Sequence, residues 1–372
     1  MGFNCGIVGL PNVGKSTIFN ALTNAGAASA NYPFCTIDPN VGRVAVPDAR
    51  LTVLAKYIPP QKLIPASMEF VDIAGLVRGA SKGEGLGNQF LAHIRATDAI
   101  AHVVRCFESS DIIHVDGNVD PARDISTIQT ELVYCDVETV TKALDRCKKS
   151  SKSGDKKLPP IIAMLEALFN HLQALNPARS FELAPFIKDM VEVEHAYRDL
   201  HLLTAKAVLY VCNVDEAMAS GTVDNQYTKI VKELAAKEGA GVVLICGKIE
   251  EELSPMDEAS RMEFLEAMGM KEPGLNRLIQ VGYETLGRMT YFTAGEKEIR
   301  AWTILKGDKA PAAAGKIHSD FEKGFICAEV YTIPDLIKAH NKTKMKELGL
   351  LRTEGRDYVV KDGDVMEFRF NV

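Results

Sequence analysis

The sequence predicts an α/β protein in which a parallel sheet carries a helical insertion and is followed by a small β-rich domain. Short apolar strands alternate with helical runs over residues 1–126 and again over residues 204–280, which is typical of a parallel sheet flanked by helices. Between these stretches, residues 127–203 contain no convincing strand, and their apolar residues recur at helical spacing. Residues 284–372 change character again and predict a separate domain that contains a hairpin.

The strands of the parallel sheet are expected to be short. We place them at residues 41–46, 67–72, 99–107, 205–212 and 241–246, with a helix at residues 225–237. The run over residues 99–107 is apolar without regular alternation, which suits a strand that is buried on both faces.

The insertion reads as two antiparallel helices joined by a polar tip. Apolar residues such as Ile128 and Leu132 mark the first helix, and Ile161 and Leu165 mark the second. Residues 148–157 between them are polar and basic, which indicates an exposed turn. In the C-terminal domain, the run over residues 365–372 alternates between apolar and polar residues and therefore predicts a half-buried antiparallel strand.

Composition limits the possible classes of protein. The 372 residues are 47% hydrophobic and 25% charged, as in ordinary globular proteins of two or three domains. No apolar stretch approaches the roughly 20 residues of a membrane span, and the N-terminus lacks the basic region of a signal peptide, so we expect a cytoplasmic protein without a membrane partner. The net charge of −6 gives no overall attraction to nucleic acid, so any RNA contact needs a local patch.

The most specific signal is the segment over residues 9–17, Gly-Leu-Pro-Asn-Val-Gly-Lys-Ser-Thr, between an apolar strand and a helical run. This is a P-loop in the context that its chemistry requires, because the N–H groups of the loop and of the helix start converge on one anion. Lys15 would bridge the β- and γ-phosphates, and the Ser16 hydroxyl would hold Mg²⁺. The residues predicted to bind the nucleotide here are Asn12, Val13, Gly14, Lys15, Ser16 and Thr17.

The elements of a GTPase-type switch follow in the usual order. Asp72 and Gly75 form a D-x-x-G motif at a strand end, where Asp72 would hold Mg²⁺ through water and the Gly75 N–H would sense the γ-phosphate. The Thr36 hydroxyl is the candidate second Mg²⁺ ligand, although an ordinary loop threonine is the alternative. Leu76 stands where many GTPases place a water-orienting glutamine, so another group must supply catalysis.

His114 is the candidate for that group. It follows the strand over residues 99–107, which places it at the same sheet edge as the phosphate site. A mobile loop histidine there could orient or activate the attacking water, and a surface histidine without a role is the alternative. We therefore name His114 and Lys15 as candidate catalytic residues.

The base-recognition segment discriminates between nucleotides. Asn213-Val214-Asp215-Glu216 stands where a GTPase carries Asn-Lys-x-Asp, so the lysine that packs over the base is replaced by Val214 and the guanine-binding aspartate by Glu216. The aspartate of a GTPase accepts hydrogen bonds from the N1–H and the 2-amino group of guanine, and adenine has no N1–H. Loss of this aspartate therefore removes an interaction that disfavours ATP. We expect weak or reversed guanine preference, with Gly247 in the segment that contacts the base through its backbone.

Taken together, these motifs resemble the YchF or Obg-like ATPase subfamily of the P-loop GTPases. Further matching pieces lie at residues 31–36, 83–91, 291–295, 320–326 and 362–365. The resemblance covers the whole chain and implies a P-loop NTPase sheet, a coiled-coil-like helical insertion and a C-terminal TGS domain, which is a ubiquitin-like β-grasp module. It also implies preference for ATP, association with ribosomes and their large subunit, His114 as the catalytic group, and a K⁺ ion held by Asn12 that acts like an arginine finger.

The predicted function is therefore a Mg²⁺-dependent ATPase switch that hydrolyses ATP to ADP and phosphate and binds ribosomes in a nucleotide-dependent way. Two alternatives stay open. One is a nucleotide-gated binding module whose hydrolysis is incidental, and the other is a true GTPase, because Asn213 is retained. The basic tip around residues 148–157 is the natural patch for rRNA, although a solvated helical tip explains it equally well.

Overall fold

The computed structural model divides into two compact units. It describes residues 3–28, 40–73, 86–110, 112, 114–115, 117–151, 155, 157–187 and 191–371. The larger unit comprises Asn4–Gly42 and Phe70–Leu278, and the C-terminal unit comprises Met1–Phe3, Arg43–Glu69 and Ile279–Val372. Within the described residues, no helix is both long enough and apolar enough to cross a membrane.

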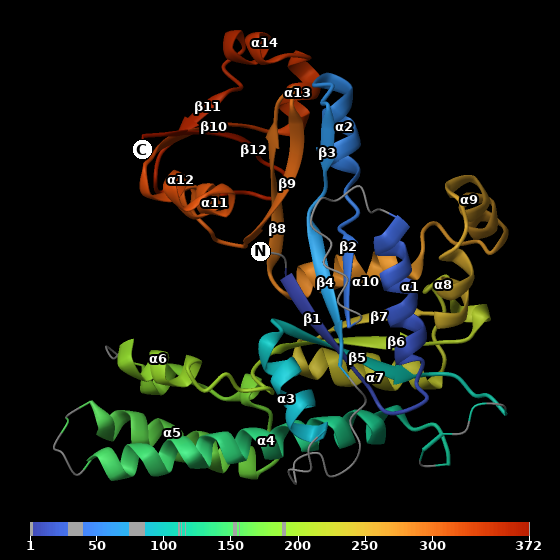
Figure 1. Cartoon of the computed structure of the whole chain (residues 1–372), viewed down its shortest axis with the longest axis vertical. Coiled ribbons are helices and arrows are strands. Elements are labelled where there is room, and N and C mark those ends of the chain that lie inside the picture. The colour runs from blue at the N-terminus through green and yellow to red at the C-terminus, as the bar shows by residue number, and fades with distance from the viewer. Residues whose placement is uncertain are drawn as a thin grey trace. The chain divides into compact units, whose positions relative to one another are not determined.

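A six-stranded sheet forms the centre of the larger unit (Figure 1). Its strands, in spatial order, are β2 (Val41–Ala45), β4 (Ser67–Asp72), β1 (Phe3–Val8), β5 (Ala99–Arg105), β6 (Ala207–Asn213) and β7 (Gly241–Ile245). Strands β1, β5, β6 and β7 pair in parallel, as the sequence predicted, but β2 runs antiparallel to β4, because the Asp72 amide donates to the Asn40 carbonyl and the Val46 amide to the Ala66 carbonyl. Every residue of β5 is buried, as the sequence predicted for a strand covered on both faces. The register pairs Arg105 at the end of β5 with Asn213 at the end of β6, so the loops that follow these two strands start side by side.

Helices cover the sheet and connect its strands. They are α1 (Lys15–Ala28), α3 (Leu86–Ala96), α4 (Pro121–Ser150), α7 (Gln226–Glu238), α8 (Gly247–Leu253), α9 (Glu258–Ala267) and α10 (Gly274–Thr285), the last of which continues into the C-terminal unit. Helix α4 contacts β5, and α7 contacts β6 and β7, while α1 packs against α8. The helix predicted at residues 225–237 is α7, and the structure shows that Asn225 caps it through a capping box.

The insertion forms a helical arm, which we define as α4, α5 (Leu158–Gln173) and α6 (Val191–Arg198). Helices α4 and α5 lie side by side and project beyond the sheet (Figure 1). The first helix begins at Pro121, earlier than the predicted boundary at residue 127, because Asp120 caps its N-terminus. The Asp136 carboxylate ties α4 to the start of β6 by accepting hydrogen bonds from the Leu203 amide and from the amide and hydroxyl of Thr204.

A mixed sheet forms the centre of the C-terminal unit. Its strands, in spatial order, are β11 (Arg352–Glu354), β10 (Phe325–Tyr331), β12 (Val365–Phe370), β8 (Arg288–Ala294), β9 (Glu298–Leu305) and β3 (Lys62–Ile64). Its helices are α2 (Ala49–Tyr57), α11 (Ala310–Ile317), α12 (Ser319–Lys323), α13 (Ile333–Ala339) and α14 (Lys342–Glu347). The hairpin of β8 and β9, with helices packed on the sheet, is a β-grasp arrangement.

Two features of strand β12 differ from the sequence prediction. Strand β12 lies inside the sheet, pairing antiparallel with β10 but parallel with β8, so it is not a purely antiparallel strand. Phe370 is exposed, although the alternation over residues 365–372 predicts that its apolar residues, Phe370 included, share the buried face. Residues 43–69 are grouped with this unit because β3 pairs with β9, although β2 and β4 at their two ends lie in the other sheet, as predicted.

Candidate functional site

The P-loop between β1 and α1 is held by close contacts that require glycine. A Cβ atom on Gly14 would lie 2.1 Å from the side-chain nitrogen of Asn213, and a Cβ atom on Gly9 would lie 2.8 Å from the Val103 carbonyl oxygen. Gly14 also has a φ angle of 91°, and Asn12 one of 62°, in the left-handed region that glycine and asparagine tolerate best. The loop then enters α1 at Lys15, so the first amides of the helix are available to an anion.

Asn213 joins three parts of the chain at the end of β6. Its side-chain nitrogen donates to the Val13 carbonyl of the P-loop at 2.9 Å, and its side-chain oxygen accepts from the Gly247 amide at 3.0 Å. The side chain is buried, so both hydrogen bonds are made away from water. Asn213 therefore aligns the P-loop with the start of α8, and does so through backbone groups.

These contacts form one side of a cavity of about 800 Å³, within the range of nucleotide-sized ligand pockets. The predicted residues that line it are Asn12, Gly14, Thr17, Asn213, Val214, Glu216 and Gly247. The opposite wall comes from the segment after β5 and includes Phe107, Glu108, Ser109 and Ile112. We call this space the nucleotide cavity.

At the base end of the nucleotide cavity, Glu216 is already paired. Its carboxylate accepts from the Lys248 ammonium group at 2.6 Å, and this hydrogen bond raises the pKa of Lys248. Both side chains remain largely exposed, so water and salt weaken the pair. Val214 is buried, and its amide donates to the Ile245 carbonyl at 2.9 Å, which leaves an apolar side chain where a lysine was expected in a GTPase.

The predicted residues Val13, Lys15 and Ser16 do not line the nucleotide cavity. At the P-loop side of the cavity, which we call its phosphate end, the Lys15 ammonium group forms an ion pair with the Asp72 carboxylate. This pair shows that the end of β4 lies within reach of the P-loop. Ser16 follows in the first turn of α1, so a hydroxyl and a carboxylate are both available near the phosphate position. Such oxygen donors fit Mg²⁺, which takes one or two protein ligands and completes its shell with phosphates and water. Thr36, Gly75 and Leu76 lie outside the described residues.

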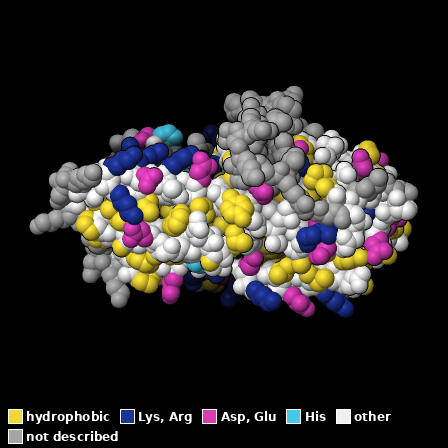
Figure 2. All heavy atoms as spheres, turned by 90° about the horizontal axis from the view of Figure 1, so that it is seen from below, with side chains coloured by type: hydrophobic (Ala, Val, Ile, Leu, Met, Phe, Trp, Pro, Cys, Tyr) yellow, Lys and Arg dark blue, Asp and Glu magenta, His cyan; other side chains and the backbone are white. Residues whose placement is uncertain are grey.

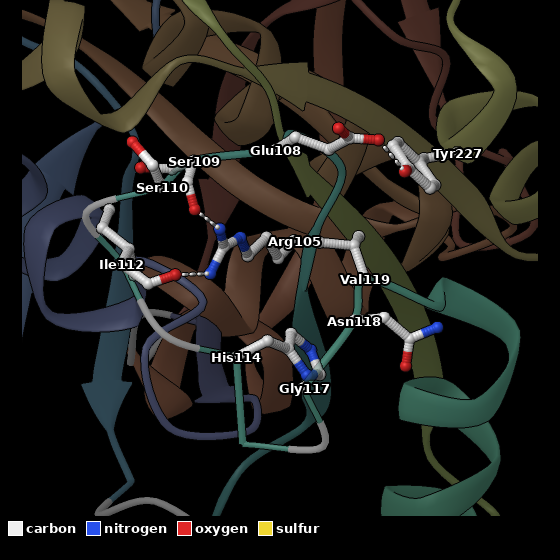
Figure 3. Close-up of a pocket in the computed structure, with 10 residues that line it drawn as sticks. All are labelled: Arg105, Glu108, Ser109, Ser110, Ile112, His114, Gly117, Asn118, Val119 and Tyr227. Carbon is white, nitrogen blue, oxygen red and sulfur yellow. Dashed lines mark hydrogen bonds between the residues drawn. The ribbon is translucent and has the colours of Figure 1, made fainter.

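His114 occupies a second cavity, of about 750 Å³, beside the nucleotide cavity (Figure 3). We call it the histidine cavity. The two cavities share Glu108, Ser109 and Ile112 in their linings. The sequence suggested a mobile loop histidine, with a surface histidine as the alternative. In the structure His114 is only 6% exposed, and its Nε2 atom lies 2.9 Å from the Asp124 carboxylate. The difference arises because the first turn of α4 places Asp124 against the loop, which the predicted helix boundary had missed.

The helical arm is less basic than its sequence suggested. Lys142 pairs with Glu138, Lys148 with Glu166, and Lys157 with Glu192. Figure 2 shows basic, acidic and apolar side chains interspersed on the underside of the molecule, where the arm lies. Lys152 and Lys156, at the predicted tip, lie outside the described residues. The described part of the arm therefore presents a mixed surface.

Comparison with known proteins decides the family. A protein of Escherichia coli O157:H7 named "Ribosome-binding ATPase YchF" is 53% identical over 372 residues, with all of both chains covered. This chain belongs to the YchF family. A Bacillus subtilis protein of the same name is 51% identical over 372 residues, again with both chains fully covered.

Structure and family models agree with this assignment. A solved structure described as the Schizosaccharomyces pombe YchF GTPase is 39% identical, matches with a TM-score of 0.85, and is similar over 99% of this chain and 98% of that one. A model described as "50S ribosome-binding GTPase" matches residues 4–139. A model of the YchF GTPase C-terminal region, described as a protein of unknown function (DUF933), matches residues 288–371. The predicted fold class, a P-loop NTPase sheet with a helical insertion and a C-terminal β-grasp domain, is confirmed.

Three residues near the cavities were not predicted as functional. Asp124 holds His114, Lys248 holds Glu216, and the Arg105 guanidinium lies in the histidine cavity. The signal for Arg105 was present in the sequence, since it is a cation inside the apolar run over residues 99–107. Asp124 and Lys248 carried no such signal, because exposed acidic and basic residues are common in helices.

Proposed function

We propose that this member of the YchF family is a Mg²⁺-dependent ATPase switch that hydrolyses ATP to ADP and phosphate and binds ribosomes in a nucleotide-dependent way. One observation carries the proposal: a single cavity joins the P-loop to a base end in which Glu216 replaces the guanine-binding aspartate and is paired with Lys248. The names of the E. coli and B. subtilis relatives, both ribosome-binding ATPases, support it.

The base end favours adenine for two reasons. A carboxylate that clamps guanine must accept both the N1–H and the 2-amino group, and Glu216 is one methylene longer than aspartate and shares its charge with Lys248. Adenine requires no such acceptor, so the replacement of aspartate by Glu216 does not weaken its binding. Val214 supplies an apolar contact next to the base. Asn213 and Gly247 hold the backbone around the base edge.

The phosphate end would bind Mg²⁺ and triphosphate by an exchange of partners. Asp72 and Ser16 would hold Mg²⁺, Asp72 through water, with Thr36 as the second hydroxyl ligand. Lys15 would leave Asp72 and contact the β- and γ-phosphates, while Gly75 would sense the γ-phosphate through its amide. When bound by these residues, Mg²⁺ would supply positive charge to neutralise the transferred phosphoryl group. Asn12 lines the cavity, and we propose that it helps hold a K⁺ ion beside the phosphates.

His114 is the proposed catalytic group. The Asp124 carboxylate can only accept a hydrogen bond, so the imidazole donates from Nε2. In the neutral ring the lone pair then lies on Nδ1, which can accept a proton from water. Since the histidine cavity shares a wall with the nucleotide cavity, a shift of this wall would bring the ring to the attacking water.

Ribosome binding is proposed to involve the large subunit, and ribosomes would place the protein in the cytoplasm. The family description of residues 4–139 as a "50S ribosome-binding GTPase" supports this choice of subunit. The tip of the arm is the proposed contact with rRNA, although its lysines at 142, 148 and 157 are partly neutralised. Changing the arm lysines to glutamine should reduce the slope of log affinity for ribosomes against log salt. An unchanged slope would mean that the arm does not contact phosphates.

The proposal is tested by measuring affinities for ATP and GTP in parallel, with Mg²⁺ and K⁺ present. Tighter binding of ATP is expected. Tighter binding of GTP would favour a true GTPase, an alternative supported by the description of the fission yeast relative. If His114→Ala abolishes hydrolysis but ribosome binding still responds normally to ATP and ADP, the chain is a nucleotide-gated binding module in which hydrolysis is incidental.

A further inference from the structure

A buried arginine stands beside His114 and has no role in the mechanism above. Arg105 is the last residue of β5 and is 1% exposed. Its guanidinium donates to the main-chain carbonyls of Phe107 at 3.1 Å, Ile112 at 2.9 Å and Ser109 at 3.4 Å. It also lies 4.8 Å from the centre of the Phe107 ring. Figure 3 shows the guanidinium directed at the Ser109 and Ile112 carbonyls. The Arg105 side chain thus binds three main-chain carbonyls in succession along the loop that leads to His114.

Stability of the strand does not explain this residue. Burial lowers the pKa of Arg105, as expected for a cation taken out of water. Within the described part of the chain, the guanidinium hydrogen-bonds to carbonyl groups but to no carboxylate. The negative charge of Asp124 acts in the opposite direction and favours the charged form of Arg105. A buried cation that hydrogen-bonds to no carboxylate nevertheless costs free energy that an apolar side chain would not. The benefit must therefore lie in the path of the loop, which Ser109 and Ile112 share with both cavities.

The imidazole of His114 is held from the other side by Asp124. This carboxylate is 2% exposed and lies in the first turn of α4, where its amide bonds to the Asp120 carbonyl at 3.0 Å. A carboxylate on a rigid helix turn fixes both the orientation of the ring and the nitrogen that carries the proton. Arg105 and Asp124 thus support His114 in different ways. Arg105 binds the main chain before His114, and Asp124 binds its ring.

We propose that Arg105 and Asp124 are positioning residues for His114, Arg105 by setting the path of the loop and Asp124 by setting the tautomer of the ring. The inference rests on the proposed function, because it requires His114 to act on the water that attacks ATP. A lysine cannot replace Arg105, since a point charge with three donors does not match three carbonyls spread across a planar fork.

The test is a double-mutant cycle in the full-length protein, read by steady-state ATP hydrolysis. Arg105→Lys keeps the positive charge but loses the planar guanidinium. His114 should then be misplaced, and kcat should fall by about 10- to 100-fold. KM for ATP should stay within about threefold, because ground-state binding is retained. In a protein that already carries His114→Ala, adding Arg105→Lys should lower kcat no further, because a residue that acts through another loses its effect when that residue is absent.

Arg277→Lys is the matched control. Arg277 also donates to three main-chain carbonyls, those of Ala219 at 2.7 Å, Ser220 at 3.0 Å and Leu244 at 3.1 Å. These carbonyls belong to segments other than the His114 loop, so Arg277→Lys should lower the unfolding temperature but leave kcat unchanged. A fall in kcat equal to that of Arg105→Lys would mean that loss of any such support slows the enzyme, and would overturn the inference.

Asp124→Asn provides a second, independent test. The Arg123 guanidinium lies 3.5 Å from the other oxygen of Asp124, so an asparagine there should turn its amide nitrogen away from Arg123 and towards His114. The ring would then carry its proton on Nδ1, the wrong nitrogen for a base. We expect kcat to fall in wild type and not in His114→Ala. A melting curve shows whether Arg105→Lys folds. If it does not fold, the Asp124→Asn result decides whether the inference holds.

The outcomes separate the two proposals. If His114→Ala hydrolyses ATP as fast as wild type, both the catalytic role of His114 and the inference fail. If His114→Ala is slow but Arg105→Lys and Asp124→Asn are as fast as wild type, only the inference fails. The inference also fails if either variant lowers the residual rate of His114→Ala by the same factor as it lowers the wild-type rate.

Discussion

The two ends of the nucleotide cavity are built on different principles. At the base end, Asn213 is buried and makes two hydrogen bonds to backbone groups, those of Val13 and Gly247. At the phosphate end, Lys15 and Asp72 hold each other through an ion pair between two partly buried side chains. In the proposed function, the first set of contacts is kept when a nucleotide binds, whereas the second would be exchanged for contacts to phosphate and Mg²⁺.

This difference assigns separate tasks to the two ends. Fixed backbone contacts at the base end can select a base without moving, because the donors and acceptors are already in place. The exchangeable pair at the phosphate end can report whether a γ-phosphate is present, because its two partners change together. The base end should therefore govern selectivity and stability, and the phosphate end should govern hydrolysis.

The largest expected effect comes from breaking the phosphate end. Lys15→Ala removes the charge that would neutralise the β- and γ-phosphates, so hydrolysis should fall by at least about 100-fold. Phosphate release at saturating ATP measures it. Turnover equal to wild type would refute the assignment of the P-loop as the hydrolytic site.

Breaking the base end should instead damage the fold. Asn213→Ala leaves the Val13 carbonyl and the Gly247 amide without their buried partner, and we expect a loss of about 2–4 kcal/mol in the free energy of unfolding. Urea unfolding measures it. Asn118→Ala removes a partner of Arg123 on the exposed surface and should cost well under about 1 kcal/mol. Equal effects of the two substitutions would show that Asn213 is not a structural link.

The fold was predictable where local pattern determines structure. The parallel strands, the capped helix α7 and the helical arm follow from apolar periodicity and capping residues. The parallel pairing of β12 with β8 and the pairing of β3 with β9 were not predictable. Both join segments that are distant in sequence, and a three-residue strand such as β3 is too short for its own pattern to indicate a partner.

The candidate site divides in the same way. The P-loop and Asn213 could be chosen as candidates because their chemistry requires fixed spacing, and the structure places Asn12, Gly14, Thr17 and Asn213 in the lining of one cavity. The burial of His114 was missed, because it depends on Asp124, which reaches it from a helix whose start was placed too late. The Lys248 partner of Glu216 was also missed. Such pairs arise from the meeting of separate elements, which no local motif encodes.

A milder change should sharpen the comparison by altering selectivity alone. Glu216→Asp together with Val214→Lys restores the guanine-binding pattern, and we expect the ratio of GTP affinity to ATP affinity to rise at least about tenfold. Titration with fluorescent nucleotide analogues measures both affinities. Lys248→Met is the control, because it frees Glu216 without shortening it and should shift the ratio less. If the double substitution leaves the ratio unchanged, selectivity resides elsewhere.

The smallest expected effect concerns β5, beneath both ends of the cavity. His102 on this strand is fully buried, and burial, followed by the charge of Arg179, lowers its pKa to about 3. Between pH 6.5 and about 3, the unfolded chain takes up a proton at this histidine that the folded protein does not. The free energy of unfolding should therefore fall as the pH falls, by about 1 kcal/mol between pH 6.5 and 5.5.

The substitution His102→Leu should remove this part of the acid dependence, whatever it does to stability at neutral pH. Urea unfolding of both proteins at pH 6.5 and 5.5 gives the four values needed, and the difference of differences cancels the packing change. His195→Gln on α6 is the control, because His195 is exposed and its ring stays in water in both states. The prediction fails if the free energy of unfolding depends on pH in the same way in wild type and in His102→Leu. That result would show that His102 accepts a proton in the folded protein, and therefore that water reaches strand β5.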